Sequence, residues 1–160
     1  MTKKKEVIAI RNPYDAVKVF KKWYKAKQEH FLAITLNGAH EVIKVHVITV
    51  GLVNRTLTHP RECYYPVIKD LASAVIFAHN HPSGSVLPSK EDVDCFRHLG
   101  MAGQILGINV LDILIFNRDG QYYSSREMGD FPEGYTTEYL EKYVADIPKT
   151  SITNVLKTDL

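Results

Sequence analysis

The sequence has little cysteine, no long apolar run and almost no net charge. Its 160 residues include two cysteines, Cys63 and Cys95, which lie 32 positions apart and form no CxxC pair. That spacing excludes the common Cys-based zinc sites and favours a reduced, cytosolic thiol pair. No apolar run approaches the roughly 18 residues of a membrane span, and the charged N-terminus lacks the apolar core of a signal peptide. We therefore expect a cytoplasmic protein that does not associate with membranes.

The charge balance gives little support to a nucleic-acid surface. Lysine and arginine exceed aspartate and glutamate by two, so the formal net charge is +2. Nucleic-acid binding domains usually carry a strongly basic face, and none is evident here. Hydrophobic residues make up 45% and charged residues 24% of the chain, which is the ordinary globular range. The length suits one domain with a substantial core.

Helical and strand patterns alternate along the first half of the chain. Asn12 and Pro13 begin a helix whose apolar spacing continues to about Lys27. Residues 29–51 alternate in the manner of a β-hairpin, with NGAH as its turn. Thr58 offers an N-cap for a second helix, and Pro60 stands near its first position.

The second half adds two buried strands around a long helix. Residues 73–79, SAVIFAH, form a continuous apolar run typical of a strand covered on both faces. A helix is predicted from Ser89 to Gly107, where Ser89 and Asp92 resemble a capping box. Residues 108–116 predict another buried strand, followed by a short partner in QYYSS. This order favours a single-domain α/β fold, with a mixed sheet flanked by helices.

The expected domain organisation has three parts. Residues 1–12 form an N-terminal tail, residues 13–128 the folded domain, and residues 129–160 a C-terminal appendage. Within the appendage, one helix is predicted from Thr137 to Asp146, between proline and glycine breaks.

Two histidines at the end of the first buried strand are candidate metal ligands. His79 and His81 are two positions apart, so in an extended strand their side chains point the same way. Asp92 can supply a third ligand if the loop returns the helix N-terminus to this point, and two histidines with one carboxylate are typical of a hydrolytic zinc. The same residues also fit a structural interpretation. An HxH motif is often a pair of surface histidines, Asp92 favours a helix N-terminus, and Ser89 can be its cap alone.

The complete spacing carries a resemblance to a known family. His79-x-His81, seven residues, Ser89, two residues and Asp92 match the HxHx7SxxD signature of the JAMM/MPN+ (JAB) metalloprotease superfamily. The text HNHPSG, followed by PS and Asp92, resembles the RadC branch of that superfamily. The similarity extends to EHFLAITLN, HPRE, ILGINVLD and YYSS, and covers roughly residues 13–125.

This resemblance implies a cytidine-deaminase-like JAMM/MPN fold with one catalytic Zn²⁺. By position, His79, His81 and Asp92 would bind the ion. Ser89 would stabilise the oxyanion of a tetrahedral intermediate, and Glu29 would transfer the proton. The implied activity is that of a zinc metallopeptidase, a hydrolase that cleaves a peptide or isopeptide bond in a peptide or protein substrate.

Two other functional classes remain open, and one is excluded. RadC-like proteins carry a DNA-repair label, so a module acting on or near DNA, associated with repair or mobile elements, is one alternative. A binding domain without turnover is the other. A zinc deaminase is excluded, because the chain has neither HxE nor PCxxC. The chain departs from the RadC pattern at Ile113, where a histidine usually follows the aspartate; that histidine is not one of the three ligands.

Overall fold

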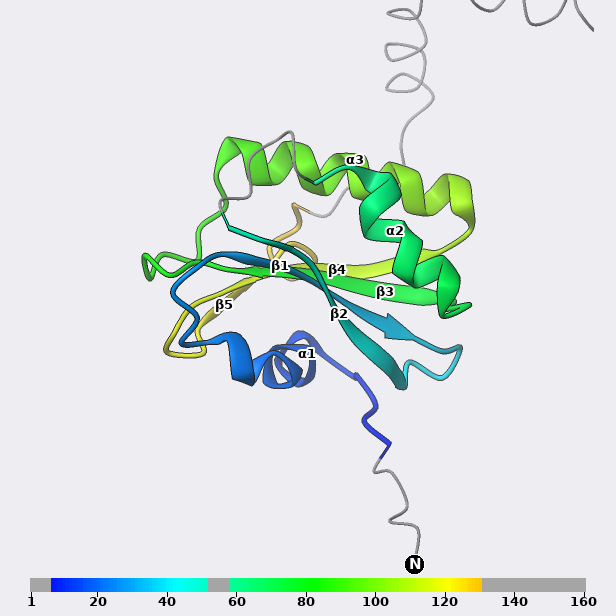
Figure 1. Ribbon diagram of the computed structural model, residues 1–160, viewed down its shortest axis with the longest axis horizontal. Helices are drawn as coiled ribbons and strands as arrows, with labels where there is room; N and C mark the ends of the chain where they lie inside the picture. The colour runs from blue at the N-terminus through cyan, green and yellow to red at the C-terminus, as the bar shows by residue number, and fades with distance from the viewer. Residues whose placement is uncertain (1–6, 52–57, 131–160) are drawn as a thin grey trace, which may run out of the picture.

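Five strands form one mixed sheet in the described residues, and helices cover both of its faces (Figure 1). The computed structural model describes residues 7–51 and 58–130, so the helix predicted at Thr137–Asp146 lies outside the described residues. In chain order the strands are β1 (His30–Leu36), β2 (Val42–Val50), β3 (Ala74–Asn80), β4 (Asn109–Phe116) and β5 (Tyr122–Ser124). Their order across the sheet is β2-β1-β3-β4-β5. The predicted α/β architecture is confirmed, and β1 and β2 confirm the hairpin predicted within residues 29–51.

A single parallel connection determines where the chemistry-bearing residues meet. β1 pairs antiparallel with both β2 and β3, and β5 pairs antiparallel with β4. β3 and β4 run parallel, and the helix α3 (Lys90–Leu106) connects them. Because a crossover helix starts where the preceding strand ends, the N-terminus of α3 lies at the carboxyl end of β3.

Each face of the sheet has its own apolar core. One face packs against α3 and the helix α2 (Pro60–Lys69), and the other packs against α1 (Pro13–Val19) (Figure 1). Every residue of β3 is buried, as expected of a strand covered on both sides. The helix side of the first core consists of Cys63, Tyr64, Val67, Phe96 and Leu99, and that of the second consists of Ala16, Val17, Phe20 and Trp23.

The first helix begins as predicted but ends earlier than predicted. The Asn12 side chain accepts a hydrogen bond from the Asp15 N–H at 2.9 Å, which caps α1. The helix ends at Val19 instead of continuing to about Lys27, and a 3₁₀ turn, η1 (Lys21–Trp23), follows. A 3₁₀ turn aligns positions three apart, so it directs Phe20 and Trp23 into the same core. Burial of these two rings explains the early end of the α-helix.

The N-cap of α2 is His59, so the prediction of Thr58 was wrong. Pro60 is the first helical residue, which makes the residue directly before it the cap. His59 Nδ1 accepts a hydrogen bond from the Arg61 N–H at 3.1 Å. A histidine nitrogen thus takes the place of the hydroxyl that the sequence pattern favours.

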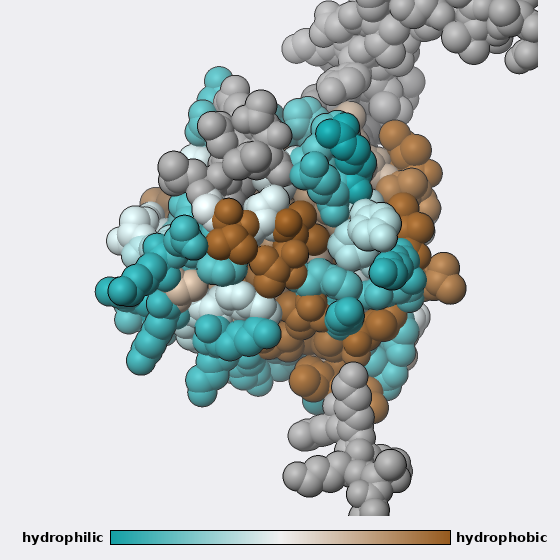
Figure 2. Space-filling view, viewed as in Figure 1, coloured by the Kyte–Doolittle hydropathy of each residue, from teal (hydrophilic) through white to brown (hydrophobic). Residues whose placement is uncertain are grey.

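The edge strand β2 carries exposed apolar side chains. Figure 2 shows apolar residues gathered on the face in view, and those of β2 are Ile43, Val47 and Val50. The segment before α1 pairs with only the start of this edge, through a bridge between Ala9 and Glu41. Within residues 7–51 and 58–130, none of the helices has the length and apolarity needed to cross a bilayer.

Candidate metal centre

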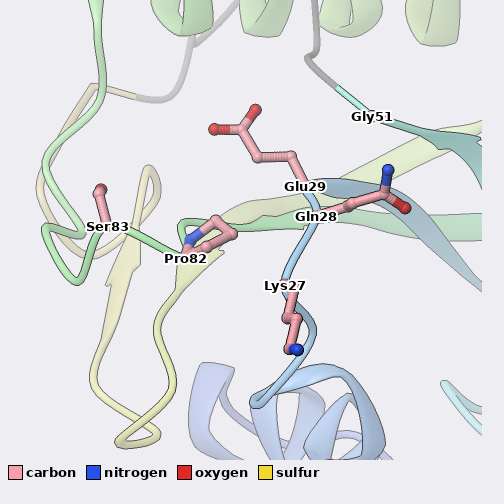
Figure 3. Close-up of a pocket in the computed structure, with 6 residues that line it drawn as sticks. All are labelled: Lys27, Gln28, Glu29, Gly51, Pro82 and Ser83. Carbon is pink, nitrogen blue, oxygen red and sulfur yellow. The ribbon is translucent and has the colours of Figure 1, made fainter.

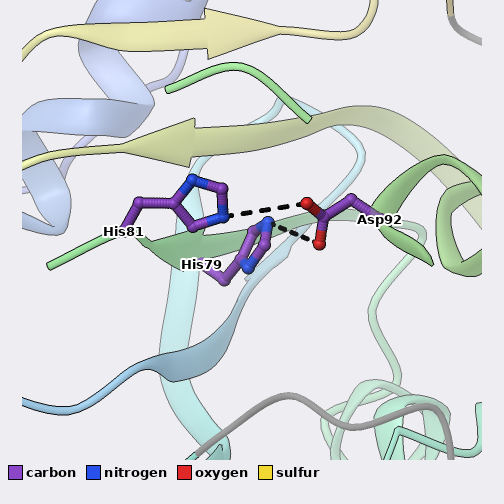
Figure 4. Close-up of side chains that lie close together, drawn as sticks. All are labelled: His79, His81 and Asp92. Atoms are coloured by element: carbon purple, nitrogen blue, oxygen red, sulfur yellow. Dashed lines mark ion pairs between the residues drawn. The ribbon is translucent and has the colours of Figure 1, made fainter. Parts of the chain in front are cut away.

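One strand residue, one loop residue and one helix residue converge at the carboxyl end of β3. One ligand atom from each of His79, His81 and Asp92 lies within 4.8 Å of the other two (Figure 4). The Nε2 atom of His79 is 3.4 Å from Oδ1 of Asp92, and that of His81 is 3.7 Å from Oδ2. The structure therefore brings together the three residues that the sequence singled out as candidate ligands, across the β3–α3 connection.

The separations of these atoms fit a shared ion better than direct hydrogen bonds. Two ligands of a tetrahedral zinc, each about 2.0–2.2 Å from the ion, lie about 3.3–3.6 Å apart. The His79–Asp92 and His81–Asp92 distances of 3.4 and 3.7 Å are close to that range. Both exceed the roughly 2.7–3.2 Å of an N–H···O hydrogen bond. The two histidines and the carboxylate thus form a group that could hold one metal ion.

His79 is buried without a hydrogen-bond partner among the described residues. It is 1% exposed, and neither ring nitrogen has a partner there. Its ring lies 6.1 Å from those of Phe31 and Phe96, measured between centroids. This burial lowers the pKa of His79 to about 4, although the Asp92 charge raises it. The imidazole is therefore neutral at pH 7, and its unpaired nitrogen suits a metal ion.

The loop after β3 sets the tautomer of His81. Its Nδ1 lies 2.7 Å from the carbonyl oxygen of Ser85. A carbonyl oxygen only accepts, so Nδ1 carries the proton and Nε2 keeps its lone pair. In metal sites, a hydrogen bond from the ring nitrogen that does not bind the ion orients the histidine ligand in this way. The backbone N–H of His81 also donates to the Phe116 carbonyl at 2.8 Å, which fixes the loop to β4.

Asp92 is held by the capping box of α3. The Ser89 N–H and hydroxyl donate to its Oδ2 atom, at 2.7 and 2.8 Å. The Asp92 N–H in turn donates to Ser89 Oγ at 3.1 Å, so the predicted capping box and the helix from Ser89 are confirmed. Asp92 is 9% exposed. Ser89 thus orients the carboxylate towards the two histidines, in addition to starting the helix.

Glu29 lies in a pocket next to the cluster. The pocket is lined by Lys27, Gln28, Glu29, Gly51, Pro82 and Ser83 (Figure 3). Pro82 and Ser83 directly follow the ligand His81 in the chain. β1 and β3 pair Phe31 with His79, so continuing this register by two residues places Glu29 opposite His81. Figure 3 shows the Glu29 side chain extending away from Lys27, above Pro82.

Sequence reasoning missed two buried asparagines beside the cluster. Asn80 and Asn117 are each 1% exposed and stand where an apolar strand ends, one after β3 residue His79 and one after β4 residue Phe116. Asn117 Nδ2 donates to the Gly84 carbonyl at 2.8 Å, which supports the loop after His81. A polar residue that ends a continuous apolar run is the signal that identifies both positions in the sequence.

The remaining histidines and both cysteines lie outside the cluster. In the described part of the chain, His79, His81 and Asp92 form the one group of three or more side chains with metal-ligand spacing. Both cysteines are free; burial, together with the nearby Asp92 charge, raises the pKa of Cys95 to about 12. Ile113 is fully buried beside Phe77 in the core under α2 and α3, where an apolar side chain suits its surroundings.

Fold and cluster together define a class: an α+β domain with a two-histidine, one-carboxylate group that can bind a metal ion. A family model described as the RadC-like JAB domain matches residues 10–130, and the chain belongs to that family. Membership supports a JAMM-type hydrolase as the class of activity and identifies no substrate.

Curated relatives from archaea and bacteria share this domain. A UPF0758 protein from Methanospirillum hungatei is 53% identical over 102 residues, which are 64% of this chain and 45% of the relative. One from Geobacillus sp. (strain WCH70) is 42% identical over 121 residues, 75% of this chain and 53% of the relative. One from Caldanaerobacter subterraneus is 38% identical over 125 residues, 78% and 53% of the two chains. The matched part thus spans about half the length of these relatives, and their name states no activity.

Proposed function

We propose that the protein is a zinc-dependent hydrolase that cleaves a peptide or isopeptide bond in a peptide or protein substrate. The observation that carries this proposal is the cluster of His79, His81 and Asp92, in which a neutral, buried imidazole has no hydrogen-bond partner among the described residues. Membership of the RadC-like JAB family supports it. Two histidines and one carboxylate form a typical ligand set of hydrolytic zinc, which leaves a fourth position for water or substrate.

Glu29 is the proposed proton carrier. A zinc ion held by the cluster would lower the pKa of a coordinated water to about 7 and polarise a substrate carbonyl. The Glu29 carboxylate accepts a proton from the attacking water and delivers it to the leaving amine. Its place in the pocket with Pro82 and Ser83, next to the ligand His81, supports this role.

Ser89 is the proposed donor to the developing oxyanion. Its hydroxyl now donates to Asp92 Oδ2, but a hydroxyl hydrogen can rotate to a second acceptor. When it does, Asp92 Oδ2 retains the hydrogen bond from the Ser89 backbone N–H, which is the shorter of the two at 2.7 Å. The carboxylate thus keeps its orientation while Ser89 stabilises negative charge on the substrate.

The test compares Glu29→Gln with the wild type after both are loaded with zinc. A library of quenched fluorescent peptides, including isopeptide-linked members, serves as the probe. We expect the substitution to lower hydrolysis by about 10²–10⁴-fold, because it removes a general base, and to leave zinc affinity unchanged. Glu62→Gln is the matched control, since Glu62 is exposed in the first turn of α2. Hydrolysis that survives Glu29→Gln, or that a chelator leaves intact, contradicts the proposal.

A further inference from the structure

Asn80 separates the two histidines in the chain and bonds to the segment that carries Glu29. It is the last residue of β3, and its side chain is buried. The Asn80 Oδ1 atom accepts a hydrogen bond from the His30 N–H at 2.7 Å, and Nδ2 donates to the Gln28 carbonyl at 3.0 Å. The two partners are a donor and an acceptor, which fixes the orientation of the amide.

These two hydrogen bonds lie immediately before and after Glu29. A third, from the Gly51 N–H to the Glu29 carbonyl at 2.8 Å, holds the same residue from the side of β2. The backbone of Glu29 is therefore fixed from both neighbouring strands. Because the backbone direction determines where a side chain starts, these bonds set the direction in which the Glu29 side chain leaves the backbone.

The Asn80 amide extends the sheet beyond its last backbone pair. β1 begins at His30, and its pairing with β3 ends at Phe31 and His79. Beyond that pair, the backbone groups of residues 28 and 30 that bond to Asn80 have no ladder partner on β3. A side-chain amide carries the same donor and acceptor as a peptide group, so Asn80 supplies the missing step. An aspartate lacks the donor.

We propose that Asn80 is a positioning residue, which fixes the Glu29 carboxylate relative to the metal ligands. This inference rests on the proposed function, in which Glu29 carries the proton. Since Asn80 stands between His79 and His81, three consecutive residues supply two of the three candidate ligands and hold the segment of the base. A misplacement of about 1 Å can lower a rate by about 100-fold. Loss of the amide should therefore lower kcat by about 10–100-fold and leave KM and zinc affinity nearly unchanged.

The first test measures position without activity. In the full chain loaded with Co²⁺, we expect Asn80→Ala to change the paramagnetic NMR shifts of the Glu29 side chain and to accelerate hydrogen exchange of the His30 amide by at least tenfold. Thr35→Val is the matched control: it removes a buried polar group of β1 whose partners are Lys44 and Asp70 instead of the Glu29 segment. The control should change neither signal. Unchanged Glu29 shifts in Asn80→Ala overturn the inference.

The second test is a double-mutant cycle with the peptide library. If Asn80 acts through Glu29, Asn80→Ala lowers hydrolysis in the wild type and has no further effect in the Glu29→Gln background. Equal losses in both backgrounds indicate a general structural role and overturn the inference. Asn80→Ser, which keeps a polar atom at the buried position, replaces the alanine variant if that variant does not fold. If Glu29→Gln retains hydrolysis, the proposed function fails, and the Co²⁺ shifts still decide whether Asn80 positions Glu29.

Discussion

Two groups among the described residues place histidine beside aspartate, and their geometries differ. In one, His46 of β2 meets Asp70 at the C-cap of α2, with 2.6 Å between Nε2 and Oδ2. In the other, His79 of β3 and His81, which directly follows that strand, lie 3.4 and 3.7 Å from the oxygens of Asp92. Each aspartate also accepts a hydrogen bond from a hydroxyl group. Thr35 donates to Asp70 at 2.7 Å, and Ser89 donates to Asp92 at 2.8 Å.

Distance, and not composition, separates a structural pair from a candidate metal site. At 2.6 Å, His46 and Asp70 satisfy each other and join β2 to α2. In the metal cluster, the separations are longer, and the two ring nitrogens of His79 have no hydrogen-bond partner among the described residues. The same residue types thus form a direct hydrogen bond in one place and a group of candidate metal ligands in the other.

Substitution of the two aspartates should give the largest difference in zinc affinity between the two groups. We expect Asp92→Ala to weaken zinc binding by more than about 100-fold, because it deletes a ligand and not merely the outer partner of a ligand. Asp70→Ala should leave zinc affinity unchanged, since His46 and Asp70 lie outside the cluster. Competition with a chromophoric chelator measures both affinities. A similar loss in the two variants would mean that the cluster is not the zinc site.

The hydrogen-bonded pair of His46 and Asp70 should contribute stability that depends on pH. Burial raises the pKa of the Asp70 carboxyl, but hydrogen bonds from His46 and Thr35, and the charges of His46 and Lys44, outweigh it. The folded-state pKa therefore lies below the unfolded value of about 3.9, so the contribution is present above that pH and is lost as pH falls through the folded value.

Asp70→Ala should accordingly lower the free energy of unfolding by about 1–3 kcal/mol at pH 7. The difference from the wild type should narrow as the pH falls below about 4. Urea denaturation at several pH values measures it. An equal or growing difference in acid contradicts the assignment of this stability to the ionised carboxylate.

Loss of the Ser89 hydroxyl should affect both stability and zinc affinity, whereas loss of the Thr35 hydroxyl should affect stability alone. Ser89→Ala removes an N-cap and an outer partner of Asp92, so we expect a loss of about 1 kcal/mol in stability and about tenfold weaker zinc binding. Thr35→Val is the matched variant: it removes the bond to Asp70 and should cost about 1 kcal/mol without changing zinc affinity. Zinc titration and urea denaturation of both variants distinguish the effects. Weaker zinc binding in Thr35→Val would show that the two groups are coupled.

Local patterns predicted much of the fold and the candidate ligands. The i, i+2 spacing of His79 and His81 and the capping box of Ser89 and Asp92 are local features, so the chain itself displays them. The structure brings the three candidate ligands together, whereas their binding of zinc stays a prediction, as do the roles of Ser89 and Glu29. The three-part division of the chain also stays a prediction.

Features that depend on distant neighbours escaped sequence reasoning. The hydrogen bond from His30 to Asn80 joins residues 50 positions apart, and the His46–Asp70 pair spans 24 positions. The early end of α1 depends on Phe20, which stacks on Phe116 of β4 with 5.5 Å between ring centroids. Tertiary contacts of this kind override local helix propensity, and one sequence does not display them.

The most direct measurement is anomalous X-ray diffraction from crystals of the zinc-loaded protein, recorded on both sides of the zinc absorption edge. We predict one strong zinc peak between His79 Nε2, His81 Nε2 and the Asp92 carboxylate, at about 2.0–2.2 Å from each ligand atom. No zinc peak should lie between His46 and Asp70. A zinc-loaded crystal without a peak at the cluster, or with its principal peak elsewhere, would contradict the central claim that these three residues form the metal centre.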